Sequence, residues 1–286
     1  MRICLYTESA LPLVGGQELV VDQLAREFLD LGHEVVVLAA RHRGRAVIRD
    51  HELPYKVVRH PRFISTHRFV SWYKRYLENL RRQFPFDVLH CHSVQPTGYV
   101  AACWPNAKGV RIVITSHCGE ISPDSRLLAK PGALDRCRKA LQRADAAVAI
   151  SDFAEQCLRG VYPELARVER IANGVPCAQF ASTIVHTPRT GRKLTPGKYF
   201  LFLGRIVERK GVDLLLQAIA QASAMIDAQC VIAHVFFRVA SRSRRACRHI
   251  RCGARRLHRL GWPMGTWRRS PYVRRCTPPR GRRRSP

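Results

Sequence analysis

Short apolar segments alternate with amphipathic segments over roughly the first 180 residues, and this alternation constrains the fold more than any other feature. Strands that are apolar throughout, and are separated by helices, are typical of a parallel sheet covered on both faces. The sequence therefore predicts an α/β, doubly wound, Rossmann-like domain. The expected strands are Arg2–Tyr6, Glu34–Ala39, Val57–Arg59 as a short edge strand, Asp87–His90, Val110–Thr115, Ala146–Ile150 and Val168–Ile171.

The segments between these strands carry helical periodicity. The first expected helix follows the loop Leu11–Gly16 and stops at Gly32, and Ser151 is the expected N-cap of the last. The first helix is predicted to bury the stripe Leu19, Val20, Leu24, Phe28 and Leu31. The other expected helices are Phe69–Arg82, whose aromatic residues are predicted to be core, Leu134–Ala144 and Asp152–Gly160.

Changes in composition divide the chain into four parts. The Rossmann-like domain is expected over residues 1–182 and a linker rich in proline, glycine and basic residues over 183–197. A second domain of the same type begins at 198–237, with a strand at Tyr199–Leu203, a helix at Val212–Ser223 and a strand at Cys230–Phe237. Periodicity is then lost, so residues 238–286 are predicted to be an irregular, arginine-rich tail. The second domain is therefore expected to be incomplete.

The positive charge of the chain is concentrated near its carboxyl end. The formal net charge is +28, but the 59 residues after Asp227 contain 17 arginines and no acidic residue. The preceding residues therefore carry a net charge of only +11. A positive field attracts polyanions, yet most of this charge lies outside the predicted α/β domain. Nucleic acid is therefore not the expected partner of that domain.

Two loops at the ends of expected strands could approach a phosphate or a sugar. Gly15 and Gly16 precede the first helix, where backbone N–H groups can come close to a ligand. Arg205 and Lys210 lie beside the amino terminus of the helix in the second domain, where a guanidinium and an ammonium group can together hold a diphosphate. The alternative for each is an ordinary tight turn or an exposed charged loop.

Seven short motifs then occur in the order that one enzyme family shows. They are Gly15-Gly16 with Glu18, Gly32-His33-Glu34-Val35, Asp87-Val88-Leu89-His90-Cys91-His92, Thr115-Ser116-His117-Cys118-Gly119, Ala144-Asp145 with Ser151, Ile171-Ala172-Asn173-Gly174-Val175, and Gly204-Arg205 with Lys210-Gly211. Together they resemble family 4 of the glycosyltransferases, which are retaining enzymes of the GT-B fold. The resemblance covers residues 2–222.

The resemblance implies transfer of a hexose from a nucleotide diphosphate sugar to a glycan or lipid-linked acceptor. Arg205 and Lys210 would neutralise the donor diphosphate, which is the main electrostatic contribution in such a transfer. Gly15 and Gly16 would line the cleft, and His117 would be the catalytic residue that faces the transferred sugar. A structural, hydrogen-bonding histidine is the alternative for His117. The resemblance implies no metal and no cofactor besides the nucleotide sugar itself.

The segment after Asp227 departs from the family. The resemblance implies two glutamates seven residues apart that hold hydroxyl groups of the donor, and no glutamate follows Asp227. Pro176 also stands where the family usually has Asp. One interpretation is a shift of reading frame near residues 224–237, which leaves the transferase truncated and inactive. The other is a genuine arginine-rich tail that binds RNA, DNA or anionic lipid through its charge. The alternative to a transferase is a non-enzymatic remnant or a polyanion-binding protein built on the α/β domain.

A basic, aromatic helix raises the question of a membrane surface. Residues Arg68 to Arg82 combine five basic side chains with four aromatic ones, a composition that suits either a core helix or the surface of an anionic bilayer. We find no signal peptide and no segment of the roughly 18–20 apolar residues that a membrane span requires. The expected location is the cytoplasm, with a peripheral contact at the inner face of the membrane as an option.

Overall fold

The chain divides into two compact units, Met1–Gln179 and Phe180–Pro286, and each is described by itself. The computed structural model describes residues 1–41, 50–61, 68–105, 107–177, 197–204, 206–222 and 229–233. The expected tail 238–286 lies outside the described residues, as does the expected linker 183–197 except for its last residue.

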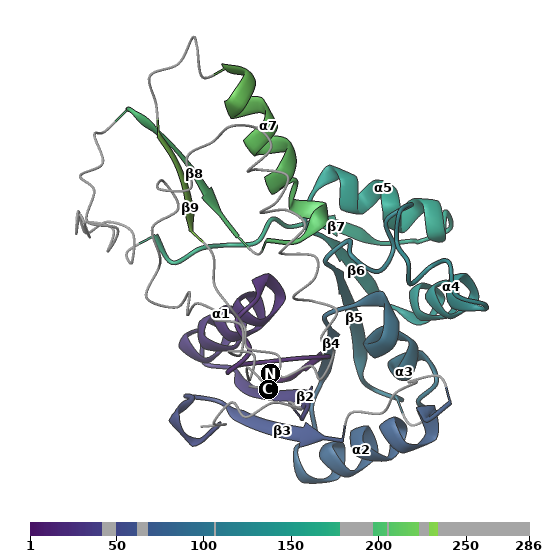
Figure 1. The fold of residues 1–286 in the computed structure, drawn as a ribbon. Coiled ribbons are helices and arrows are strands. Elements are labelled where there is room, and N and C mark those ends of the chain that lie inside the picture. Colours follow the sequence, from purple (N-terminus) through teal and green to yellow (C-terminus); the bar gives the residue numbers. More distant parts are fainter. Residues whose placement is uncertain are drawn as a thin grey trace, which may run out of the picture. The chain divides into compact units, whose positions relative to one another are not determined.

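The first unit is built on a seven-stranded sheet in the order β3-β2-β1-β4-β5-β6-β7 (Figure 1). Every neighbouring pair of strands is parallel. This confirms the predicted doubly wound parallel sheet, with the short strand β3 at one edge. The strands are β1 (Arg2–Thr7), β2 (Glu34–Ala40), β3 (Lys56–His60), β4 (Val88–Cys91), β5 (Arg111–Ser116), β6 (Ala146–Ala149) and β7 (Val168–Arg170).

Helices cover both faces of this sheet (Figure 1). The longer ones are α1 (Gly16–Asp30), α2 (Val70–Gln83), α4 (Ala133–Arg143) and α5 (Asp152–Val161). The shorter ones are η1 (Asp50–Glu52), η2 (Val94–Gly98) and α3 (Tyr99–Ala102). The expected caps are present, since Gly32 has φ +79° and Ser151 Oγ accepts a hydrogen bond from Ala154 N at 3.2 Å.

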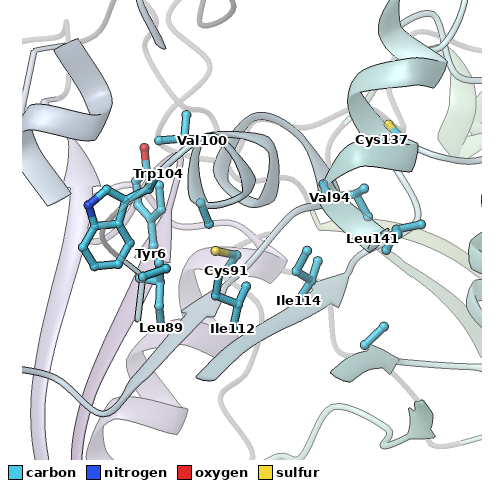
Figure 2. Close-up of a cluster of buried hydrophobic side chains, with 14 of the residues drawn as sticks. Tyr6, Leu89, Cys91, Val94, Val100, Trp104, Ile112, Ile114, Cys137 and Leu141 are labelled. Carbon is cyan, nitrogen blue, oxygen red and sulfur yellow. The ribbon is translucent and has the colours of Figure 1, made fainter. Parts of the chain in front are cut away.

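Alternate residues of the central strands enter two separate cores, as the pleat of a strand requires. Ile3 and Leu5 of β1 pack with Val21 and Ala25 of α1 on one face. Cys4 and Tyr6 belong to the larger core on the other face. Figure 2 shows part of this larger core, in which strand residues meet side chains of α3, α4 and the segments beside them. The labelled residues are Tyr6, Leu89, Cys91, Val94, Val100, Trp104, Ile112, Ile114, Cys137 and Leu141.

Two details of the predicted helices are wrong. In α1 Val21 and Ala25 are buried, and Leu24 and Phe28 of the expected stripe pack against the same core, whereas Leu19 and Leu31 are 50% and 71% exposed. Leu19 stands two residues before Val21 and so lies on the opposite side of the helix, and Leu31 is the C-cap residue after the last turn. In α2 the buried residues are Tyr73, Leu77 and Leu80, whereas Trp72 is 54% exposed.

The segment between β4 and β5 also contains a helix that the sequence did not predict. It consists of η2 followed by α3, and its buried residues include Val94, Val100 and Ala101. Pro96 and Gly98 interrupt the apolar pattern there, so no helical period can be read from it. The Ser93 side chain caps this segment by accepting a hydrogen bond from Thr97 N.

The described part of the second unit is a strand, a helix and a parallel strand. β8 (Tyr199–Leu203) pairs in parallel with β9 (Gln229–Ala233), and α7 (Val212–Ala222) lies between them in the sequence. The short turn η3 (Glu208–Lys210) precedes α7. Residues 234–237 of the expected strand, and Ser223 of the expected helix, lie outside the described residues. Parallel pairing agrees with the start of a second α/β domain.

None of the helices in the described part of the chain combines the length and the apolar character needed to cross a bilayer.

Candidate functional site

The candidate residues of the first unit follow three adjacent strands of the sheet. Gly15 and Gly16 follow β1, His92 follows β4 and His117 follows β5, and these strands lie in the order β1-β4-β5. From β1 the chain continues toward β2 and β3 on one side, and it returns to β4 on the other. Open α/β sheets bind ligands at such a switch point, outside the carboxyl ends of the strands.

The Glu18 side chain of α1 lies against Gly15 in the glycine loop. Gly15 precedes the helix in an extended conformation, and a Cβ placed on it would lie 2.4 Å from Glu18 Oε2. The Glu18 carboxylate accepts a hydrogen bond from Ser9 Oγ, which holds it over the first turn. A negative side chain at a helix amino terminus interacts favourably with the helix dipole. The amino terminus of α1 therefore carries its own carboxylate.

Gln17 ties the same turn of α1 to the ends of two strands. Its Nε2 donates to Thr7 Oγ1 at 3.0 Å and to the backbone oxygen of His92 at 2.6 Å. The glycine loop and the end of β4 are thus fixed relative to each other. The sequence did not single out Gln17, because nothing near it in the chain shows that its amide reaches His92.

Three histidine rings lie side by side at the ends of β4 and β5. The ring centroids of His90 and His92 are 4.4 Å apart, and those of His92 and His117 are 5.7 Å apart with planes inclined by 20°. His92 Nδ1 lies 3.4 Å from His117 Nε2, and His90 Nε2 lies 2.7 Å from Thr115 Oγ1. The sequence identifies His117 as a candidate site residue, whereas it shows His90 and His92 only as members of a motif.

Burial keeps these histidines neutral. It lowers the pKa of His90 to about 4 and the pKa of His92 well below its ordinary value. The neighbouring histidines lower both pKa values further, by a smaller amount. Burial also lowers the pKa of His117, although the Glu18 carboxylate opposes this shift. Gln17 beside the glycine loop contacts His92, and His92 contacts His117, so the structure brings the loop and His117 to the same end of the sheet. Near pH 7 the three rings act as hydrogen-bonding groups rather than as cations.

Glu120 supports the loop that carries His117. Its Oε1 accepts hydrogen bonds from Val94 N at 3.1 Å and from Ser116 Oγ at 3.4 Å. Burial raises the pKa of Glu120, and these hydrogen bonds offset only part of the shift. The carboxylate thereby joins the segment after β4 to the segment after β5. Only its position three residues after His117 could have suggested this role from the sequence.

The predicted diphosphate site belongs to the second unit. Arg205 lies outside the described residues, and Lys210 is exposed at the end of η3, two residues before α7. Gly211 has φ +62°, a left-handed conformation that suits glycine and turns the chain from Lys210 into α7. The roles assigned to Arg205 and Lys210 stay predictions. Within the described ranges no group of three or more His, Cys, Asp or Glu side chains is arranged to hold a metal ion.

Comparison with known proteins identifies the family. The sequence profile described as Glycosyltransferase Family 4 matches residues 14–179, which is more than half of the chain and includes Gly15, Gly16 and His117. A search of the curated proteins finds no significant match.

Several solved glycosyltransferases share the fold at low sequence identity. Sucrose-phosphate synthase from Thermosynechococcus elongatus is 18% identical with a TM-score of 0.65, and the match covers 91% of this chain and 68% of that one. HepE from Anabaena in complex with UDP is 18% identical with a TM-score of 0.59, and the match covers 91% of this chain and 66% of that one. The lipopolysaccharide outer core galactosyltransferase WaaB is 17% identical with a TM-score of 0.57, and the match covers 93% of this chain and 70% of that one. The chain thus spans about two thirds of the length of these GT-B proteins. The family profile and the parallel sheet agree, and the chain belongs to glycosyltransferase family 4.

Proposed function

We propose that this protein transfers a hexose from a nucleotide diphosphate sugar to a hydroxyl group of a glycan or lipid-linked acceptor, with retention of configuration. The observation that carries the proposal is the meeting of the glycine loop, Glu18 and His117 at the switch point of the sheet. Family membership supports the reaction class. The solved complexes of HepE with UDP and with UDP-glucose support a uridine nucleotide sugar as the first donor to test.

The electrostatics of the first unit favour hydroxyl groups over phosphate at the glycine loop. The Glu18 carboxylate already occupies the amino terminus of α1, where it would repel a phosphate and accept hydrogen bonds from sugar hydroxyls. The neutral ring of His117 at the end of β5 can form a hydrogen bond with a sugar without adding charge. We therefore assign sugar hydroxyls, rather than phosphate, to the glycine loop and His117 of the first unit.

Calorimetric titration of the full chain with UDP-glucose and UDP-galactose tests the proposal. A charge-assisted hydrogen bond contributes about 1.5–3 kcal/mol, so Arg205→Ala or Lys210→Ala should weaken binding by about 10-fold to 100-fold. Lys139→Ala, which removes an exposed charge from α4 in the first unit, serves as the matched control and should leave affinity unchanged. If no nucleotide diphosphate sugar binds, or if Arg205→Ala has no effect, the proposal fails.

One observation favours a second candidate, a non-enzymatic protein that binds polyanions. The 59 residues after Asp227 carry 17 arginines with no acidic residue, and such a segment binds polyanions in a salt-dependent manner. Retention of the full chain on heparin should then fall steeply with salt while calorimetry shows no binding of nucleotide sugar. Nucleotide-sugar binding that Arg205→Ala weakens would reject this candidate in favour of the enzyme.

We also propose that the protein works in the cytoplasm and contacts the inner face of the membrane through α2. The exposed side of this helix carries Trp72, Arg75 and Arg82, a combination of aromatic and basic side chains that suits an anionic bilayer surface. The full chain should sediment with vesicles that contain anionic lipid and not with neutral vesicles. Arg75→Glu with Arg82→Glu should reduce sedimentation, whereas Arg138→Glu with Lys139→Glu on α4 should not. Equal sedimentation with both kinds of vesicle would remove this proposal.

A further inference from the structure

His92 is held at the switch point by its backbone. Its N–H donates to the carbonyl oxygen of Tyr6 at 2.8 Å, and its carbonyl oxygen accepts from Gln17 Nε2 at 2.6 Å. The residue follows β4 directly, so the hydrogen bonds to β1 and α1 fix where its side chain begins. The side chain is wholly buried.

Neighbouring rings confine the His92 side chain. It lies beside the rings of His90 and His117, whose centroids are 4.4 Å and 5.7 Å from its own. His90 Nε2 pairs with Thr115 Oγ1 at 2.7 Å. The partner of His92 Nδ1 is His117. Nδ1 of His92 lies 3.4 Å from His117 Nε2. His92 Nε2 is buried and has no hydrogen-bond partner among the described residues.

A neutral His92 carries one ring proton, on Nε2 or on Nδ1, and these two positions differ in free energy. On Nε2 it would form an N–H group that is buried without an acceptor, which is rare in proteins and costs free energy. On Nδ1 it donates to His117 Nε2. A neutral imidazole carries only one N–H, and the second arrangement gives that N–H its partner.

We propose that His92 is a positioning residue that donates from Nδ1 to His117 Nε2 and thereby holds neutral His117 with its own proton on Nδ1. The hydrogen bond at one ring nitrogen decides which nitrogen carries the proton, so His92 acts on the ligand only through His117. His117 then offers a fixed N–H donor at Nδ1, and its Nε2 lone pair is not available as a base. The tautomer follows from the geometry alone, and only the statement that a sugar oxygen accepts this hydrogen bond rests on the proposed function.

Histidine tautomers can be read directly by NMR, without a ligand. In the full chain labelled with ¹⁵N-histidine, two-bond ¹H–¹⁵N spectra at pH 7.5 distinguish the Nδ1–H from the Nε2–H form. The signals of His117 are assigned by their loss in His117→Gln. We expect the Nδ1–H form in the unsubstituted protein. A signal of the Nε2–H form would overturn the proposal.

Two substitutions at His92 separate positioning from packing. His92→Phe keeps a ring of similar volume but has no donor, so His117 should change to the Nε2–H form that free imidazole side chains prefer. His92→Asn places an amide donor near the position of Nδ1 and should restore the Nδ1–H form. His90→Gln is the matched control, because its partner is Thr115, and it should leave the tautomer of His117 unchanged. An unchanged tautomer in His92→Phe would contradict the proposal.

The outcome is independent of the proposed function. Failure of nucleotide sugars to bind would overturn the transferase proposal and leave the tautomer measurement intact. Conversely, an Nε2–H signal from His117 in a protein that binds UDP-glucose would overturn the role of His92 alone.

Discussion

At the scale of single residues, the backbone next to His117 is unusual. Cys118 is the only described residue other than glycine with a positive φ, which is 65°. A left-handed conformation costs an L-residue about 1–2 kcal/mol, and it is least tolerable for a β-branched side chain. Cys118 already bears this cost and a β-branched valine adds to it, so Cys118→Val should lower the free energy of unfolding by about 1 kcal/mol, as measured by urea denaturation.

A second cysteine provides the control for this prediction. Cys103 is also partly buried, but its φ is −88°, where valine is tolerated. Cys103→Val should cost clearly less than Cys118→Val, and Cys118→Gly should avoid the conformational cost. Equal effects of the two valine substitutions would show that lost packing, rather than backbone conformation, limits position 118.

At the scale of elements, Glu120 links the segments after β4 and β5. Both Val94 N and Ser116 Oγ donate to Oε1, so Glu120→Gln keeps an acceptor for both, removes the charge and replaces the second oxygen with an amide group. Because burial raises the pKa of Glu120, the folded state binds the carboxyl proton more tightly than the unfolded state does. Stability is therefore lost as the pH rises from the ordinary pKa of a glutamate through the raised one.

Glu120→Gln should consequently be as stable as the unsubstituted protein, or more stable, at pH 8, with the difference narrowing toward pH 5. Glu120→Ala leaves Val94 N–H without its acceptor and should cost about 1–3 kcal/mol. Urea denaturation at the two pH values measures both effects. A Glu120→Gln protein as unstable as Glu120→Ala would contradict this account of the carboxylate.

The helices and strands also show which parts of the fold could be predicted from the sequence and which could not. The strands and the longer helices were predictable, because each has its own apolar period and its own caps, such as Ser151 and Gly32. The exposure of Leu19 and Leu31 and the helix η2–α3 were not predicted, because apolar residues alone do not show which of them lie on the packed face or where Pro96 and Gly98 still allow a helix. Among the candidate site residues, His117 and Gly15 stand at strand ends and within family motifs. The contacts of His92 and Glu120 join segments that are far apart in the sequence, so only the fold reveals them.

At the scale of the whole molecule, the buried histidines should make stability sensitive to acid. The folded-state pKa of His90 is about 4, below its ordinary value of 6.5, because burial disfavours the charged ring. Between these two values the unfolded chain binds a proton at His90 that the folded protein does not. The free energy of unfolding should therefore fall as the pH falls from 6.5 toward 4, by up to about 1.4 kcal/mol per pH unit for each such histidine. His92 contributes in the same direction, since burial also lowers its pKa.

Replacing one of these histidines isolates its share of the acid sensitivity. His90→Gln keeps a polar group near Thr115 Oγ1 but cannot bind the proton, so the dependence of stability on pH should become shallower by about 1.4 kcal/mol per pH unit between pH 6 and 5. Glu120 changes stability in the opposite direction, and it does so equally in both proteins, so its contribution cancels in the difference. Above pH 7.5 His90 is neutral in both the folded and the unfolded state, and the two profiles should run parallel. Urea denaturation at half-unit pH steps measures these slopes, and equal slopes below pH 6 would show that His90 is already protonated in the folded protein.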